Sequence, residues 1–223
     1  VLASGQGSPL LQTTGLVEGV QFREYYYLVD GANYVKVKLD QATPACSTWT
    51  GPASIAVSGV KASIIARFGA RLALSGLKNT PNNWWLSAID DPEDWTPTAG
   101  TPEDSIAGDP IVALIPFGER GLLFGCTHSM TYLTSDPAFG DARMVEMSRT
   151  VGVVGPRAWC SGPEKTTFVL GQDGLYVLNP NTFNVDRASR VTAGRLDNAF
   201  LRLDFGTALA AGGLVSGGTL AQT

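Results

Sequence analysis

The chain has few charged residues. Of its 223 residues, 16% are Asp, Glu, Lys or Arg, whereas a typical soluble domain has about 25%. The formal net charge is −4, which argues against a protein that grips nucleic acid through a basic surface. Because charged residues are so few while 44% of the residues are hydrophobic, we expect an unusually large buried area, part of it shared with other subunits.

Histidine and cysteine are almost absent. The one histidine, His128, stands two residues from Cys126, and Cys46 and Cys160 are far from both in the sequence. A zinc site needs four ligands, and a catalytic triad needs a base oriented beside a nucleophile. An odd number of cysteines without repeated spacing is not a disulfide framework. The sequence therefore predicts no catalytic residue, metal or cofactor, and we expect buried free thiols in a reducing compartment.

Long apolar runs and familiar catalytic motifs are also missing. No run reaches 18 apolar residues, so we expect no transmembrane helix. The G-x-S-x-G, P-loop, H-E-x-x-H and G-x-G-x-x-G patterns do not occur. The acidic residues of 90–94 lack the spacing of a calcium loop and favour Asp turns. We therefore predict that the chain is not an enzyme, with a propeller glycosidase or lyase as the enzymatic alternative.

What the sequence does contain is a repeat. Four segments each hold an apolar strand, a Gly-centred turn and a second strand rich in aromatic or β-branched residues. The segments are residues 22–37, 71–87, 121–133 and 167–178. Their second strands, taken at Tyr34, Trp84, Met130 and Leu175, are about 50, 46 and 45 residues apart, a period typical of propeller blades. Because one such unit cannot bury its own apolar face, its neighbours must cover it.

We therefore predict an all-β fold, a β-propeller or partial propeller of about four blade-like repeats. Residues 1–20 are rich in Gly, Ser and Thr and are expected to form an N-terminal arm. Residues 21–185 form the propeller-like domain, and residues 186–223 a short helix and a flexible Gly-rich tail. Further strand or hairpin signals lie at residues 54–57, 111–135 and 144–147.

Three stretches carry a recognisable order of motifs. The first contains Arg67-Phe68-Gly69-Ala70-Arg71-Leu72, then Trp84-Trp85-Leu86-Ser87 and Asp91-Pro92-Glu93-Asp94-Trp95. The second runs from Asp109-Pro110 to Ser135-Asp136-Pro137, where Ser135 stands at the usual Gly of a G-D-P turn, and the third joins Gly152-Val153-Val154-Gly155-Pro156 to Asp173-Gly174-Leu175-Tyr176. Together they resemble the propeller-bearing virion proteins of tailed bacteriophages, of the tail nozzle (tail tubular protein B) type. The resemblance covers roughly residues 64–180.

The resemblance implies a structural component of a tailed phage particle. It would be a nozzle or adaptor protein that assembles in a homo-oligomeric ring with other tail or neck proteins. The ring would form part of the DNA ejection conduit, with DNA passing through the channel without sequence readout. The protein would be made in the cytoplasm of the host bacterium and end in the virion tail. The alternative is a glycan- or receptor-binding tail module.

The aromatic runs are the expected contact points with partners. Adjacent residues of a strand point to opposite faces, so one ring of each run is expected to enter the blade core and the other to face a neighbouring blade or subunit. Large aromatic rings also dominate many protein interfaces. The predicted partner-interface residues are Tyr25, Tyr27, Trp84, Trp85, Asp94 and Trp95.

Overall fold

The computed structural model describes most of residues 15–187. The described residues are 11, 15–40, 45–52, 60–96, 108–118, 121–162, 165–172, 174–179 and 184–187, the last range by its backbone alone. Within these ranges the chain is all-β, apart from one 3-10 turn at Pro137–Phe139. No helix there is long and apolar enough to cross a membrane.

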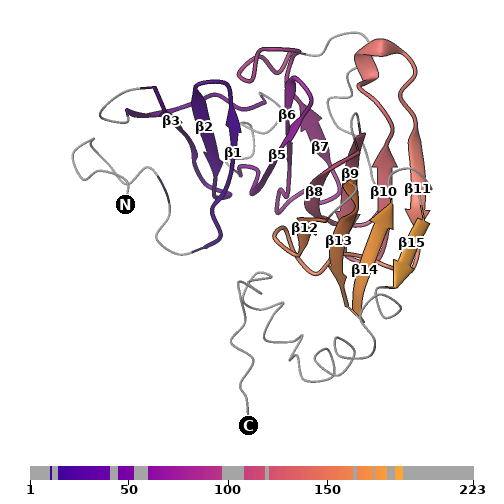
Figure 1. Cartoon of the computed structure of the whole chain (residues 1–223). Helices are drawn as coiled ribbons and strands as arrows, with labels where there is room; N and C mark the ends of the chain where they lie inside the picture. Colours follow the sequence, from indigo (N-terminus) through magenta and orange to yellow (C-terminus); the bar gives the residue numbers. More distant parts are fainter. Residues whose placement is uncertain are drawn as a thin grey trace.

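The strands form four antiparallel sheets, named sheets 1 to 4 in chain order (Figure 1). Sheet 1 contains β1 (Glu18–Phe22), β2 (Tyr25–Val29), β3 (Tyr34–Lys38) and β4 (Cys46–Thr48). Sheet 2 contains β5 (Ile64–Phe68), β6 (Arg71–Ser75) and β7 (Trp84–Leu86). Sheet 3 contains β8 (Ile111–Phe117), β9 (Gly121–Cys126), β10 (Met130–Leu133) and β11 (Met144–Ser148). Sheet 4 contains β12 (Trp159–Ser161), β13 (Thr167–Gly171), β14 (Gly174–Asn179) and β15 (Asn184–Arg187).

Each sheet is a meander, in which every strand pairs with the strand that precedes or follows it in the chain. Such local pairing needs only short connections between neighbouring strands. None of the four sheets closes on itself in the described part of the chain. The first strands of sheets 1 to 3 lie near one another, because β5 has β1 on one side and β8 on the other. The chain is therefore a row of similar sheets, and sheets 1 to 3 are joined most closely along their first strands.

Three apolar cores lie between consecutive sheets. The first lies between sheets 1 and 2 and is rich in rings, including Tyr27, Tyr34 and Trp85. The second, between sheets 2 and 3, contains mostly aliphatic side chains around Trp84 and Phe124. The third joins sheets 3 and 4. Each sheet thus covers the apolar face of its neighbour, which a single meander of this size cannot bury alone.

The position of a sheet in the row can be read from the burial of its strands. All residues of β6 and β9 are buried, because sheets 2 and 3 have a neighbour on both faces. A strand covered on both faces has no need of alternating polar residues. In β14 of sheet 4, by contrast, buried and half-buried residues alternate. This alternation is typical of a sheet with a packed neighbour on one face.

Several predictions from the sequence are confirmed. The all-β class is correct, and the four repeats coincide with the second and third strands of the four sheets. The hairpin predicted in 111–135 is formed by β8 and β9, and the strand at 144–147 is β11. The repeats omitted the first strand of every sheet, and β1 begins at Glu18, inside the segment predicted as an arm. The strand predicted at 54–57 and the helix and tail predicted in 186–223 lie outside the described residues, apart from the end of β15.

Candidate functional site

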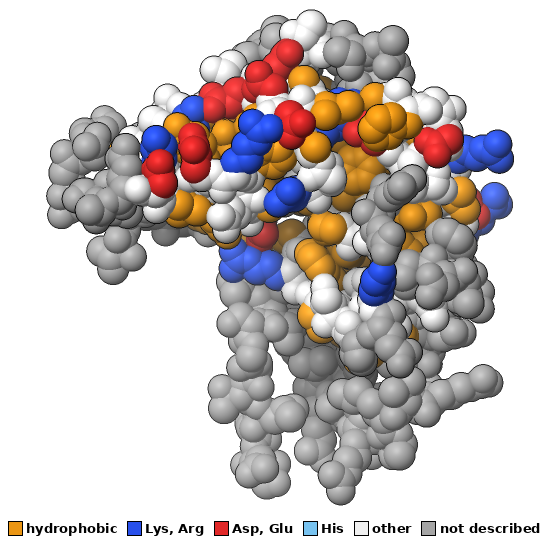
Figure 2. All heavy atoms as spheres, turned by 45° about the horizontal axis from the view of Figure 1, so that its top comes forward, with side chains coloured by type: hydrophobic (Ala, Val, Ile, Leu, Met, Phe, Trp, Pro, Cys, Tyr) orange, Lys and Arg blue, Asp and Glu red, His pale blue; other side chains and the backbone are white. Residues whose placement is uncertain are grey.

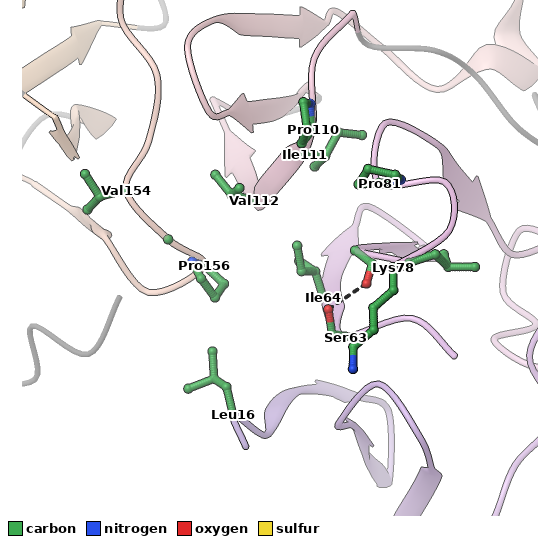
Figure 3. A pocket seen from close by; sticks show the side chains of 13 residues that line it. Leu16, Ser63, Ile64, Lys78, Pro81, Pro110, Ile111, Val112, Val154 and Pro156 are labelled. Atoms are coloured by element: carbon green, nitrogen blue, oxygen red, sulfur yellow. Dashed lines mark hydrogen bonds between the residues drawn. The ribbon is translucent and has the colours of Figure 1, made fainter. Parts of the chain in front are cut away.

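The starts of the four first strands meet at one pocket with a volume of about 410 Å³ (Figure 3). Leu16 stands before β1, Ile64 begins β5, Ile111 begins β8, and Val154 and Pro156 precede β12. All five line the pocket, so every sheet contributes to it. The first strands begin 46, 47 and 48 residues apart. The same repeat that builds the sheets therefore builds the pocket.

The pocket is apolar, with one charged residue among those that line it. Ser63 is already engaged, because its hydroxyl donates to the carbonyl oxygen of Gly76 at 2.8 Å (Figure 3). Lys78 is the charged residue, and its side chain is exposed. Among the described residues that line this pocket there is no carboxylate, histidine or cysteine. The arrangement suits a small apolar group with an anionic end near Lys78.

An ion pair beside the pocket joins the two ends of the row of sheets. Arg157, next to Pro156, donates from Nε to Oε1 of Glu18 at 2.8 Å and from Nη2 to the carbonyl oxygen of Val17. Burial raises the pKa of Glu18, and the Arg157 guanidinium partly offsets this effect. The start of sheet 4 therefore touches the start of sheet 1, although no core of buried residues between these two sheets occurs in the described part of the chain.

The loop that follows β7 crosses to sheet 1. Asp90 pairs with Arg23 at 2.7 Å between Oδ1 and Nη2, and Glu93 pairs with Lys36. Glu93 also accepts a hydrogen bond from the Tyr27 hydroxyl at 3.4 Å. Burial and then the Glu93 carboxylate raise the pKa of Tyr27 well above its usual value. Figure 2 shows Asp and Glu side chains along the upper edge of this face, with Lys and Arg side chains close by.

Trp95, near the end of the described part of this loop, anchors it. Its ring stacks near Trp49, with centroids 6.2 Å apart, and its Nε1 donates to the carbonyl oxygen of Thr50 at 3.0 Å. The Asp91 carboxylate accepts from the backbone N–H groups of Glu93 and Asp94, as the sequence predicted for an Asp turn. The acidic run is therefore used in turns and in ion pairs with sheet 1.

The loop that follows β10 crosses to sheet 2 in the same way. Asp136 Oδ2 accepts from Arg71 Nε at 2.6 Å, and the Arg71 side chain is 1% exposed. Arg71 also donates from Nη1 to the carbonyl oxygen of Ser87 at 2.7 Å. The other carboxylate oxygen of Asp136 accepts from the backbone N–H of Ala138 and caps the 3-10 turn. One aspartate thus holds both its own turn and the neighbouring sheet.

The predicted partner-interface residues lie at contacts between sheets of this chain. Trp85 enters the core shared with sheet 1, and Trp84 enters the core shared with sheet 3, so the adjacent rings do point to opposite faces. Tyr27 and Trp95 are also buried in the first core. Tyr25 and Asp94 are half-buried and are the members of the set with surface left for a partner. Whether they bind one stays a prediction.

The cysteines and the histidine do not gather. Cys126 is buried, Cys46 is half-buried and Cys160 is exposed, so the prediction of buried thiols is wrong for Cys160. Burial, and then the nearby Asp109, raise the pKa of Cys126 to about 12, which keeps it a thiol at neutral pH. His128 is exposed. Within the described residues, no three His, Cys, Asp or Glu side chains are placed to hold a metal ion.

Comparison with solved structures shows a likeness of fold. No family model and no curated protein matches the chain. The extracellular domain of a putative one-component system from B. thetaiotaomicron matches with a TM-score of 0.52 and 10% sequence identity. The match covers 76% of this chain and 22% of that chain, so this chain spans about a fifth of its length. At this identity the likeness concerns the fold alone.

Proposed function

We propose that the chain is a non-enzymatic structural module, built as an open array of β-propeller blades. The observation that carries this proposal is the common pocket at which all four first strands begin. Propeller blades are four-stranded meanders arranged around a central axis, with consecutive blades packed face to face. The three cores between consecutive sheets and the period of 46 to 48 residues support the same reading.

In this proposal, the module is part of the particle of a tailed bacteriophage. The order of the motifs, which resembles that of phage tail proteins, supports this proposal. Three residues of these motifs also form contacts between neighbouring sheets. Arg71, Ser87 and Asp136 form one connected group of hydrogen bonds between sheets 2 and 3. The apolar pocket has the size of a small-molecule site. DNA would therefore pass through a ring of several copies, and not along the axis of one chain.

Quantitative mass spectrometry of density-purified particles tests this setting. We expect the protein to band with the particles and to keep a fixed copy number relative to the other particle proteins through a second gradient. An abundant soluble host protein, followed through the same gradients, serves as the control. Recovery of the chain only in the soluble fraction of the lysate would contradict the phage role. It would not bear on the proposed propeller fold, which an experimental structure would test.

A binding module is the second candidate, and the pocket is the observation that favours it. A glycan that stacks on Trp84 or Trp95 is less well supported, because both rings are buried between sheets. An apolar anion at the pocket fits the lining and the exposed Lys78 better. We expect the chain to bind anilinonaphthalene sulfonate and Val112→Trp, which fills the pocket, to abolish the signal. Unchanged fluorescence in this variant would exclude the pocket as the binding site.

A further inference from the structure

A short segment at the start of β1 lies along one side of the pocket. We call this segment, residues 15–18, the strap. Leu16 of the strap lines the pocket and is half-buried, and Glu18 is the first residue of β1. Figure 3 shows the Leu16 side chain pointing toward Pro156, with Lys78 on another side of the pocket. The strap therefore supplies an apolar part of the wall, away from the lysine.

The strap begins at a glycine whose backbone conformation other residues rarely adopt. Gly15 has a φ of 131°, which is disfavoured for any residue with a Cβ atom. A Cβ atom there would meet no atom of the described residues within 4 Å. The position thus calls for glycine because of its backbone and not because of its space. Hinges are a few positions at the ends of elements that absorb large changes in φ and ψ, and Gly15 is placed to be one.

The residue that holds the strap comes from a turn fixed to sheet 4. Arg157 bonds to the Glu18 carboxylate and to the carbonyl oxygen just before it in the strap. On one side of Arg157, the backbone N–H of Val154 donates to the carbonyl oxygen of Leu170 at 3.1 Å. On the other side, the N–H of Leu170 donates to the carbonyl oxygen of Ala158 at 2.8 Å. The guanidinium is therefore presented from a base that is tied to β13 at both ends.

The strap also lies where the walls of the pocket are held most weakly. Apolar cores hold sheet 1 to sheet 2, sheet 2 to sheet 3 and sheet 3 to sheet 4. Moving any of these boundaries would expose apolar surface to water, which is unfavourable in proportion to its area. Lifting the strap breaks polar contacts that water can replace, and the Arg157 side chain is already 47% exposed. The strap is therefore the part of the wall that can move most easily.

We propose that the strap is a latched lid, which lifts about Gly15 to admit a ligand and is held closed by Arg157. This inference rests on the pocket as a binding site, the second candidate function above, and names how access to that site is controlled. The latch bonds to the strap and not to the ligand, so it holds the lid closed over an empty or a filled pocket. It therefore sets the rates of entry and exit and leaves the affinity unchanged.

Labelling of a cysteine in the strap measures the lid without a ligand. The full chain carries Leu16→Cys, with serine in place of Cys46 and Cys160, while Cys126 is buried and stays. In this background Arg157→Gln should raise the rate of reaction with a maleimide about tenfold, because the strap loses hydrogen bonds to a charged group. An unchanged rate would overturn the proposal. Circular dichroism confirms that each variant folds.

Two further comparisons separate the latch from a general loosening of the fold. Arg149→Gln is the matched control, because Arg149 also bonds through Nε to a glutamate, Glu146, but on β11. It should leave the labelling rate unchanged, and an equal acceleration would refute the latch. Raising the salt concentration from about 0.05 M to about 0.5 M screens an accessible ion pair. Labelling should therefore speed up with salt when the latch is intact and stay constant in Arg157→Gln. Gly15→Ala should also speed it up, because alanine disfavours the closed backbone.

Stopped-flow binding of anilinonaphthalene sulfonate connects the lid with the pocket. In Arg157→Gln the association and dissociation rate constants should both rise about tenfold, with Kd unchanged. Glu18→Gln breaks the same ion pair and removes a charge of the opposite sign, so it should act alike. A rise in the dissociation rate alone would show that Arg157 holds the dye and would overturn the proposal. If the dye bound to no variant, the pocket would fail as a binding site and the lid would lose its role in ligand entry. The labelling rates would distinguish this failure from failure of the latch.

Discussion

The loops after β7 and after β10 occupy the same place in successive sheets, and each ties its sheet to the preceding one by different means. In both, an aspartate meets an arginine that stands at or next to the hairpin between the first and second strands of the neighbouring sheet. The Arg23–Asp90 pair is exposed, with side chains 61% and 63% accessible, whereas those of Arg71 and Asp136 are 1% and 15% accessible. The two loops therefore make their contacts at the same position in the repeat, but the two ion pairs should contribute differently to stability.

The difference follows from what surrounds each pair. An exposed ion pair gains little, because water and salt screen it and two long side chains lose freedom. A buried pair also adds little net stability, because desolvation of the two charges costs about as much as their attraction gains. Removing one partner, however, leaves the other charge buried without a counter-charge. The first loop is held mainly by Trp95 and the second by Asp136. Three predictions test this contrast, and a fourth tests the cores that lie between the same sheets.

The largest effect is expected at the buried pair. Asp136→Asn keeps the acceptor that caps the 3-10 turn but leaves the Arg71 guanidinium buried without a counter-charge. We expect a loss of about 3–5 kcal/mol in the free energy of unfolding, measured from the urea midpoint at constant slope. Asp90→Asn is the matched control and should change the stability by about 0.5 kcal/mol or less. Equal effects of the two variants would refute the contrast between the loops.

Trp95 should be the strongest anchor of the first loop. Trp95→Ala removes a ring that is 9% exposed and stacks beside Trp49, and should cost about 3 kcal/mol. Trp95→Phe keeps most of the ring but loses the hydrogen bond to the Thr50 carbonyl oxygen, so it should cost about 1 kcal/mol. The urea midpoints of both variants give the comparison. A Trp95→Ala variant as stable as the wild type would mean that the ion pairs, and not the ring, hold this loop.

Rising alkaline pH should destabilise the second core first and then the first core. Burial raises the pKa of Cys126 in the second core from 9.0 to about 12 and that of Tyr34 in the first core from 10.0 to about 12. In each case the unfolded chain loses its proton at lower pH than the folded chain. The stability is therefore fully present below the unfolded pKa and is lost as pH rises toward the folded pKa.

Thermal melts between pH 8 and 11 would show this order. By pH 10 the wild type should lose about 1 kcal/mol of unfolding free energy, because Cys126 loses its proton more easily in the unfolded chain. Above pH 10 it should lose further stability, because the Tyr34 hydroxyl also begins to titrate in the unfolded chain. Cys126→Ala, compared with its own stability at pH 8, should delay the onset from near pH 9 to near pH 10. Tyr34→Phe should leave the onset unchanged and reduce the later loss. An unchanged onset in Cys126→Ala would show that the thiol is not the first group to titrate.

The sequence predicted the sheets better than it predicted the contacts between them. The apolar strand and Gly turn of each repeat are local signals, so the second and third strands were found. Among the first strands, β8 was found as part of the hairpin predicted in 111–135, whereas β12, with three residues, carries too little pattern to stand out. The pocket was missed because Leu16, Ile64, Ile111 and Val154 come from four repeats and meet only when the sheets align. A search at the repeat period for apolar residues before each first strand could have found it.

Arg71 shows why the ion pairs were also missed. An arginine in an otherwise apolar strand is a visible signal, but its partner Asp136 is 65 residues away and belongs to another repeat. Asp136 was quoted only as part of an Asp-Pro turn, and the turn and the ion pair use different carboxylate oxygens. The sequence indicates that such a partner lies in a loop, but it does not indicate which arginine it meets. The aspartate reaches Arg71 only because consecutive sheets pack against each other.

The smallest effect is expected at Arg23, where backbone strain and the exposed pair act in opposite directions. Arg23 has a φ of 53°, a left-handed conformation that costs a non-glycine residue about 1 kcal/mol. Arg23→Ala loses the pair and keeps the strain, so it should lower the stability by about 0.5 kcal/mol. Arg23→Gly loses the same pair but relieves the strain, so it should be about 1 kcal/mol more stable than Arg23→Ala. If both variants lost 2 kcal/mol or more in urea, the exposed pair would carry as much weight as the buried one, and the contrast between the two loops would disappear.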